Sequence, residues 1–163
     1  MLNTDWSNMG PLPLGEFAEF YAQTELLSYG LDVYPSRVDD HAVDFIIKDK
    51  SGRFKEIQVK SVYKGKYAYV SKDKMHISKD NPVIKNDYYW FFIHFVDGEM
   101  PKTYIIPGTD WEKAKEDGVL LIDRDYNGKK SAPEYGLSIT QKSMQKLQKY
   151  EVTPALIRKY FED

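Results

Sequence analysis

The sequence predicts an α/β domain with a mixed central β-sheet flanked by helices. Three observations predict it: an apolar pattern at helical spacing near the start, pairs of short β-rich runs joined by turn residues, and helix-start signals near the end. With 163 residues, the chain is long enough for one domain with a hydrophobic core and short for two.

The first predicted helix spans Gly15–Tyr29, because apolar residues recur there at helical spacing and Gly30 is well placed to end it. Residues 1–14 contain a glycine and two prolines and are expected to form an extended N-terminal arm. Residues 15–163 show no repeat, low-complexity tract or linker. We therefore expect them to form a single domain.

Short β-rich runs separated by turn residues predict the strands of the sheet. They lie at Val33–Pro35, Val43–Lys48, Phe54–Val62, Tyr67–Ser71, Tyr88–Val96, Thr103–Ile106, Val119–Ile122 and Gly136–Ile139. The turn residues Ser51-Gly52 predict that the second and third runs form a hairpin. Further helices are expected at Asp110–Glu116, at Thr140–Tyr150 and after the capping pair Thr153-Pro154.

The composition excludes some kinds of protein and favours others. The chain has no cysteine, which excludes disulfides and zinc–thiolate sites and suits a reducing compartment. No basic start followed by an apolar run marks a signal peptide, and the longest apolar stretch, Tyr88–Val96, is too short to span a bilayer. We expect a cytoplasmic protein with no membrane partner.

Charge is distributed unevenly along the chain. The formal net charge of −2 argues against an obligate, charge-driven nucleic-acid coat protein. Between residues 60 and 85, however, seven lysines stand against two acids. A local basic segment of this kind leaves nucleic-acid binding open.

In the third predicted strand, side chains alternate between two faces. Ile57 and Val59 point to one face, and Glu56, Gln58 and Lys60 to the other. By pattern alone, this is an ordinary amphipathic strand.

The preceding predicted strand, Val43–Lys48, adds a carboxylate that could act together with this polar face. Asp44 is a lone carboxylate in an otherwise apolar run, where its burial would be costly without a partner. In a hairpin, Asp44 would lie beside Gln58 and Lys60. Carboxylates together with water and phosphate are what Mg²⁺ prefers, so this corner of the sheet is a plausible cation site.

These residues resemble a known family. Gly15-Glu16-Phe17-Ala18-Glu19, then Asp44, then Gln58-Val59-Lys60-Ser61 resembles the PD-(D/E)xK nuclease superfamily, especially branches related to archaeal Holliday-junction resolvases and small endonuclease-like proteins. In that pattern a helix with a glutamate precedes a hairpin. The first strand gives the aspartate, and the second gives an acid or glutamine and then the lysine. The resemblance covers roughly residues 15–62 and implies a restriction-endonuclease-like core.

The resemblance also implies roles. Asp44 would be the principal ligand of Mg²⁺ or Mn²⁺, Gln58 a second ligand through its amide oxygen, and Glu19 would reach in from the helix. Lys60 would orient the attacking water or stabilise charge on the phosphate. Two positions depart from the pattern: Val43 stands where it has proline, and Gln58 where it mostly has an acid. Glu56, on the same face, is a further possible metal ligand that would restore the missing charge.

Four cations are candidates for contacts with nucleic acid. Lys64, Lys66 and Lys72 are interleaved with tyrosines, and basic side chains beside aromatic rings can hold phosphates and stack bases. Lysines on an edge strand also protect against aggregation, which is an equally good explanation. Arg37 could bind a phosphate through two hydrogen bonds or form a surface ion pair.

Three functions follow from these patterns. The first is a metal-dependent nuclease that hydrolyses phosphodiester bonds in DNA. The second is a catalytically inactive nuclease-like module that binds nucleic acid, with Gln58 as the mark of lost catalysis. The third is a protein-interaction domain in which the aromatic run Tyr88–Val96 forms a homodimer interface.

Overall fold

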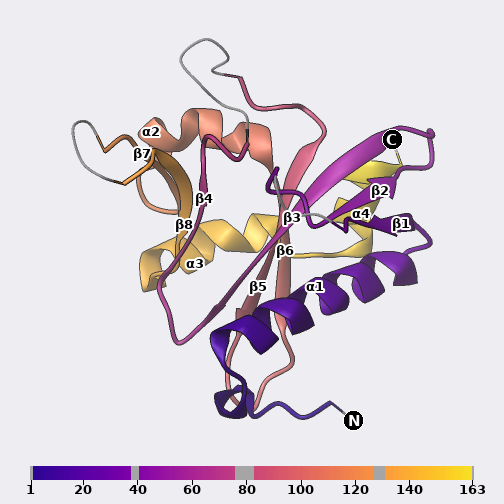
Figure 1. Ribbon diagram of the computed structural model, residues 1–163, viewed down its shortest axis with the longest axis horizontal. Helices are drawn as coiled ribbons and strands as arrows, with labels where there is room; N and C mark the ends of the chain where they lie inside the picture. Colours follow the sequence, from indigo (N-terminus) through magenta and orange to yellow (C-terminus); the bar gives the residue numbers. More distant parts are fainter. Residues whose placement is uncertain (1, 38–40, 76–82, 127–130, 163) are drawn as a thin grey trace.

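The structure, a computed structural model, describes residues 2–37, 41–75, 83–126 and 131–162. It contains a five-stranded mixed sheet in the order β1-β2-β3-β5-β6 and a three-stranded antiparallel sheet in the order β4-β8-β7 (Figure 1). The predicted α/β fold with a mixed sheet and flanking helices is confirmed.

The five-stranded sheet is antiparallel except at its centre, where β3 and β5 run parallel. Its strands are β1 (Asp32–Pro35), β2 (Phe45–Lys48), β3 (Phe54–Tyr63), β5 (Tyr88–Phe95) and β6 (Lys102–Pro107). The smaller sheet consists of β4 (Tyr67–Ser71), β7 (Leu121–Arg124) and β8 (Glu134–Ser138). Because β4 follows β3 directly, the chain passes from one sheet to the other at the end of β3.

Two hydrophobic cores lie on opposite faces of the larger sheet. Helices α1 (Pro11–Ser28) and α4 (Pro154–Phe161) pack on one face, with α1 running across it in Figure 1. The smaller sheet packs on the other face together with α2 (Ala114–Asp117) and α3 (Gln141–Leu147). Two short 3₁₀ helices, η2 (Gly108–Lys113) and η3 (Gln148–Tyr150), lie on this second face. A third, η1 (Trp6–Asn8), lies on the face of α1, where Trp6 packs against Phe17. None of the described helices is long and apolar enough to cross a membrane.

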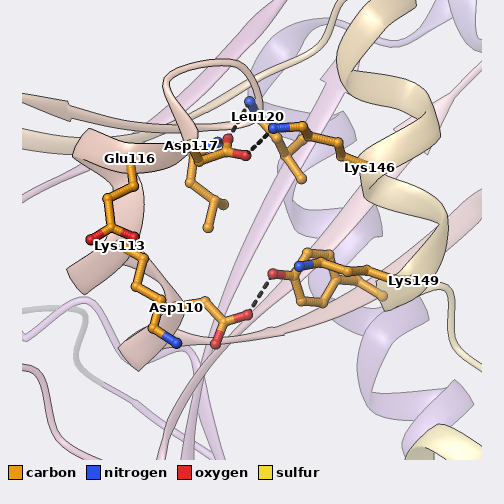
Figure 2. A pocket seen from close by; sticks show the side chains of 9 residues that line it. Asp110, Lys113, Glu116, Asp117, Leu120, Lys146 and Lys149 are labelled. Carbon is orange, nitrogen blue, oxygen red and sulfur yellow. Dashed lines mark hydrogen bonds and ion pairs between the residues drawn. The ribbon is translucent and has the colours of Figure 1, made fainter.

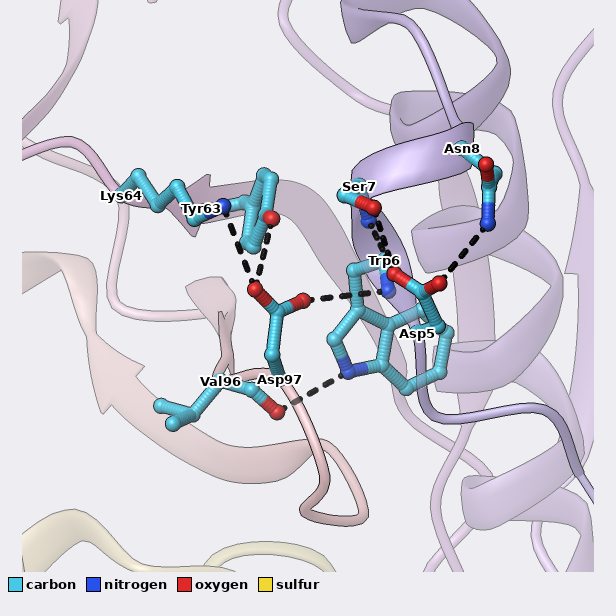
Figure 3. A network of polar contacts seen from close by, with 8 residues as sticks. All are labelled: Asp5, Trp6, Ser7, Asn8, Tyr63, Lys64, Val96 and Asp97. Carbon is cyan, nitrogen blue, oxygen red and sulfur yellow. Dashed lines mark hydrogen bonds and ion pairs between the residues drawn. The ribbon is translucent and has the colours of Figure 1, made fainter.

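Helix α1 begins four residues earlier than the sequence predicts, so the extended conformation expected for residues 11–14 is wrong. Both prolines, Pro11 and Pro13, lie in the first turn, where a missing N–H breaks no helical hydrogen bond. Before the helix, Trp6 is 1% exposed and its indole N–H donates to the carbonyl of Val96. The start of the chain is therefore held against the turn that follows β5 (Figure 3).

The hairpin predicted around Ser51-Gly52 is present. Strands β2 and β3 pair antiparallel, and Gly52 has φ of 85°, a conformation that favours glycine. The carboxylate of Asp49 accepts hydrogen bonds from the Ser51 hydroxyl and the Arg53 backbone N–H. These bonds fix the turn and with it the register of the two strands that carry the candidate site.

The aromatic run β5 lies in the middle of the sheet, between β3 and β6. All its residues except His94 are buried, and alternate side chains enter the two cores. Both strand edges and both faces are thus occupied within this chain. The hypothesis that Tyr88–Val96 forms a homodimer interface is therefore wrong.

The predicted caps near the C-terminus are confirmed. The side chain of Thr140 accepts a hydrogen bond from the Ser143 N–H before α3, and Thr153 does the same for the Leu156 N–H before α4. Each cap satisfies a helical N–H that would otherwise lack a partner.

Candidate active site

The candidate site lies where the ladder between β2 and β3 ends. Strand β2 begins at Phe45, opposite Ile57, whereas β3 continues to Tyr63. On its other edge, β3 pairs with β5 along residues 56–63. The edge of β3 that faces β2 therefore extends beyond its partner at residue 58, and a side chain from the segment before β2 can reach it there.

A cavity of about 230 Å³ lies at this edge. It is lined by residues of α1, of the segment before β2 and of β3: Gly15, Ala18, Glu19, Asp44, Gln58, Val59, Lys60 and Ser61. Four of the residues singled out from the sequence (Glu19, Asp44, Gln58 and Lys60) thus line one space. Their roles in metal binding and catalysis stay predictions.

Asp44 is fixed to the edge of β3 by three hydrogen bonds. Its Oδ2 accepts from the amide Nε2 of Gln58 and from the backbone N–H of Val59, both at 2.5 Å. Its own N–H donates to the carbonyl of Ile57 at 2.9 Å. The half-buried carboxylate thus has the polar partners that its location requires, and it supplies an acceptor to the edge of β3 beyond the β2 ladder.

Gln58 is 4% exposed and makes both of its recorded bonds through the amide nitrogen. Besides Asp44, this nitrogen donates to the carbonyl of Val59 at 3.1 Å. The nitrogen side of the amide therefore faces the carboxylate. For Gln58 to bind a cation together with Asp44, the amide would have to turn so that its oxygen points into the cavity.

Glu19 reaches the cavity because α1 packs closely against β3. The buried residues Ala18 and Ala22 are small, so the helix can approach the sheet. Glu19 follows Ala18 and is half-buried at the rim of this contact. The second carboxylate of the site thus comes from an element far from Asp44 in the sequence.

Glu56 does not line the cavity. It pairs with Ile46 within the β2–β3 ladder, and its carboxylate forms an ion pair with Lys85 at 2.9 Å. Glu56 lies two positions before Gln58, and therefore before the point where the edge of β3 extends beyond β2. The structure therefore gives no support to Glu56 as a substitute ligand.

The side chains around the cavity fit a hydrated Mg²⁺ or Mn²⁺ ion. Among the residues described, no group of three or more histidines, aspartates and glutamates surrounds a common point. Mg²⁺ needs less, because it keeps several waters and binds through one or two carboxylates plus phosphate oxygens. Asp44 and Glu19 would supply the carboxylates, and Gln58 an amide oxygen after turning.

A second cavity adjoins the first and shares Gln58, Lys60 and Ser61 with it. Its volume is about 470 Å³, and its opposite side is formed mainly by β4: Tyr67, Ala68, Tyr69, Val70, Ser71 and Lys74. The sequence suggests the tyrosines as stacking residues only through their lysine neighbours. Their position beside the candidate site depends on how the two sheets pack, for which the sequence carries no local signal.

Lys64 takes part in a polar network at the end of β3 (Figure 3). Its ammonium group lies 3.2 Å from the carboxylate of Asp97, which also accepts bonds from the Tyr63 hydroxyl and the Trp6 backbone N–H. The bond from Tyr63 and the ion pair with Lys64 hold the pKa of Asp97 below its ordinary value. This network joins the end of β3 to the turn after β5.

The other predicted contacts with nucleic acid differ in their surroundings. Lys72 forms ion pairs with Asp123 at 2.6 Å and Asp125 at 3.0 Å. Lys66 and Arg37 are exposed. Their binding to nucleic acid stays a prediction.

A third cavity, of about 460 Å³, is lined by residues of η2 and α2 on one side and of α3 and η3 on the other (Figure 2). It is also lined by acids and lysines, among them Asp110, Asp117, Lys146 and Lys149. Asp117 accepts bonds from three backbone N–H groups of residues 119–121 and pairs with Lys146. Burial alone would raise the pKa of Asp117, but Lys146 and these N–H groups lower it to about 2.

Comparisons with known proteins show similarity at the level of structure rather than of sequence. No family model matches the chain, and no curated protein matches its sequence. Among solved structures, the fold is similar to that of the bacterial homing endonuclease I-Ssp6803I. The two are 18% identical over 90% of each chain, with a TM-score of 0.48.

Proposed function

We propose that this protein is a metal-dependent nuclease of the PD-(D/E)xK type that hydrolyses phosphodiester bonds in DNA. The observation that carries the proposal is the convergence of Glu19, Asp44, Gln58 and Lys60, from three separate segments, on one cavity. Carboxylates beside a lysine form a site for a cation and a phosphate together. The absence of cysteine suits a reducing, cytoplasmic setting for this activity.

Asp44 and Glu19 would hold the metal ion, which when bound supplies a water of lowered pKa and polarises the phosphate. Asp44 is suited to this because its bond from the Val59 N–H and its own N–H bond to the Ile57 carbonyl fix it at the edge of β3 before any ligand arrives. Preorganised charge costs no rearrangement during the reaction. Glu19, from α1, would supply the second negative charge.

Lys60 would act on the phosphate rather than on the metal. It lines both the small cavity and the adjoining one towards β4, so its ammonium group can lie between the cation and a DNA strand. There it would orient the attacking water and stabilise the negative charge that develops on the phosphate oxygens. The bond to the leaving oxygen breaks as the water oxygen bonds to phosphorus.

One observation favours a second candidate, a module that binds nucleic acid without cutting it. The amide nitrogen of Gln58 donates to Asp44 and to the Val59 carbonyl. The nitrogen, rather than the oxygen, therefore faces the place where a cation would bind between Gln58 and Asp44. A cation at this position must break the bond between Gln58 and Asp44. If the cation cannot break this bond, the cavity still has Lys60 to bind a phosphate but no metal ion with which to hydrolyse it.

The test is cleavage of DNA by the purified full chain. Supercoiled, linear, branched and single-stranded DNA are each incubated with Mg²⁺, Mn²⁺, Ca²⁺ or EDTA. We expect cleavage with Mg²⁺ or Mn²⁺ and none with EDTA. Asp44→Asn should abolish cleavage and weaken Mn²⁺ binding measured by titration calorimetry, since asparagine can still accept both hydrogen bonds but carries no charge. Metal-independent cleavage, or none on any substrate, would contradict the proposal.

A further inference from the structure

The outer face of the smaller sheet carries two adjacent tyrosines. Along β4, Ala68 and Val70 point into the core, whereas Tyr67, Tyr69 and Ser71 point outward. The rings of Tyr67 and Tyr69 lie nearly parallel, at 19°, with centroids 6.1 Å apart. Tyr69 is 54% exposed, so this large ring is available to a ligand.

The ring of Tyr67 is held in place by its surroundings. It lies across β8 at Gly136, where a Cβ atom would overlap the Tyr67 hydroxyl and ring, so that only glycine leaves room for it. The hydroxyl donates to Glu134 at 2.9 Å, and the guanidinium carbon of Arg124 lies 4.4 Å from the ring centroid. The ring of Tyr67 is thus fixed in position, and the ring of Tyr69 stacks beside it.

The charge of this face is suited to a polyanion. Its buried acid, Glu134, is compensated, because it accepts from the hydroxyls of Tyr67 and Tyr126 and lies 3.8 Å from Arg124. Lys74 is exposed beside the tyrosines. The surface therefore combines ring faces with cationic groups, as in sites for single-stranded nucleic acid.

This face is continuous with the candidate active site. The cavity of about 470 Å³ extends from Lys60 to the tyrosines, and a further cavity of about 430 Å³ extends from the tyrosines to Arg124 and Tyr126. Both cavities are lined by Tyr67, Tyr69 and Ser71. A nucleic-acid strand with its phosphate at Lys60 would thus pass over Tyr69.

We propose that this face binds unpaired nucleotides next to the scissile phosphate, with a base stacked on Tyr69 and the backbone held by Lys74 and Arg124. The proposal rests on the proposed function, because it takes Lys60 as the position of the phosphate. An exposed ring can stack only on an uncovered base, and inside a duplex both base faces are covered. The outer face also lacks, among the residues described, the freely extended Arg, Asn or Gln side chains that read base edges in a duplex groove, since Arg124 is stacked on Tyr67.

The test is binding measured by fluorescence anisotropy in EDTA at fixed salt. The probes are a 30-base-pair duplex, the same duplex with a central unpaired loop containing 2-aminopurine, and a single strand. We expect Tyr69→Ala to weaken binding of the loop and the single strand by roughly fivefold to a hundredfold, and binding of the plain duplex by less than about twofold. Tyr69→Phe should restore the affinity and the quenching of 2-aminopurine, because it keeps the ring.

The matched control is Tyr34→Ala, at another exposed tyrosine, on the edge strand β1. It should change binding of none of the probes. Unchanged binding in Tyr69→Ala, or an equal loss on duplex and loop, would overturn the proposed surface even if the protein cuts DNA with Mg²⁺. Binding that depends on Tyr69 without any metal-dependent cleavage would instead support the surface and overturn the nuclease proposal.

Discussion

Two cavities of this protein are lined by the same kinds of residue but differ in what those residues do. One holds Asp44, Glu19 and Lys60, and the other, in Figure 2, holds Asp110, Asp117 and Lys146. The second is about twice as large, at about 460 Å³ against about 230 Å³. Size and residue type alone would therefore favour the second cavity over the one that we propose as the active site.

The difference lies in what the charges hold together. In Figure 2, Asp117 binds the backbone at the start of β7 and pairs with Lys146 of α3, and Asp110 of η2 accepts a bond from the Tyr150 hydroxyl of η3 at 2.5 Å. These charges join neighbouring elements. Burial and the Asp110 carboxylate raise the pKa of Tyr150, so it stays a neutral donor. The contacts that charged side chains make thus indicate the role of a cavity better than the residue types that line it.

The largest expected effect is on the cleavage rate, when the lysine of each cavity is replaced in turn. Lys60→Ala should reduce cleavage at least about a hundredfold, a barrier rise of roughly 3 kcal/mol, because a preorganised positive charge near the phosphate is lost. Its matched control, Lys146→Ala, removes the lysine of the other cavity and should leave the cleavage rate within about twofold. Single-turnover rates measured with Mg²⁺ compare the two variants.

The stability of the same two variants is also informative, because Lys146 is held in an ion pair of the second cavity. Lys146→Ala removes the partner of Asp117 and should lower the free energy of unfolding, measured in urea, by roughly 1 kcal/mol. Lys60→Ala should leave the protein folded, and its free energy of unfolding is measured under the same conditions. If both variants lost activity in proportion to stability, the contrast between a functional and a structural cavity would be lost.

The next effect concerns the pH dependence of stability at Asp117. Because its folded pKa, about 2, is below the ordinary value of 3.8, its contribution is present above about pH 4 and is lost as the pH falls towards 2. This difference corresponds to at most about 2 kcal/mol. We therefore expect Asp117→Asn to be less stable than wild type at pH 7 and nearly equal to it at pH 2, in urea unfolding at both pH values. Equal stability at pH 7 would show that the backbone bonds alone hold this turn.

Part of the site could be predicted from the sequence because it depends on local rules. The Ser51-Gly52 turn fixes the hairpin, and alternation along β3 then places Gln58 and Lys60 near Asp44. The resemblance to the PD-(D/E)xK nucleases added Glu19, whose position depends on how α1 packs on the sheet. No local pattern could supply that contact.

Other features depend on packing between distant segments and could not be read in advance. Gly136 is required because the ring of Tyr67 lies over it, and these residues are about seventy positions apart. The pairing of Glu56 with Lys85 likewise removes a residue that strand alternation assigns to the site. The early start of α1 was missed for another reason, since Pro11 and Pro13 suit a first helical turn as well as an extended arm.

A smaller effect is expected when the neutral ligand is changed to a charged one. Gln58→Glu places a second carboxylate against Asp44, so we expect Mg²⁺ to bind about tenfold more tightly in calorimetry. Without metal, the two carboxylates repel, which should raise the pKa of the pair and lower stability at pH 7 by roughly 1 kcal/mol, with recovery as the pH falls below about 5. Higher cleavage activity would mean that glutamine is a weakened ligand, and lower activity that it is tuned for this site.

The control for this variant is Gln148→Glu at an exposed position of η3. It adds the same charge away from the site and should change neither Mg²⁺ affinity nor metal-free stability measurably. Weaker binding of Mg²⁺ by Gln58→Glu than by wild type would contradict the placement of the cation between Gln58 and Asp44.

The smallest effect distinguishes lysines that are paired with carboxylates from one for which the structure records no ion pair among the described residues. Lys64 pairs with Asp97 and Lys72 with Asp123, whereas Lys66 is exposed and has no such pair. Each lysine that neutralises a phosphate contributes about 0.9 to the slope of log affinity against log salt concentration. Lys66→Ala should therefore lower the slope by about one, and Lys64→Ala should leave it nearly unchanged, in binding titrations from 50 to 200 mM salt.

Replacing all three lysines together tests whether Lys64 and Lys72 stay paired with their carboxylates when DNA binds, or leave them for phosphates. If the ion pairs persist when DNA binds, replacing Lys64, Lys66 and Lys72 together by alanine should lower the slope by about one. If the lysines leave their carboxylates for phosphates, the slope should fall by about three. In that case the acids released, Asp97 and Asp123, would face the DNA, and Asp97→Asn should strengthen binding. An unchanged slope in the combined variant would show that none of these three lysines touches a phosphate.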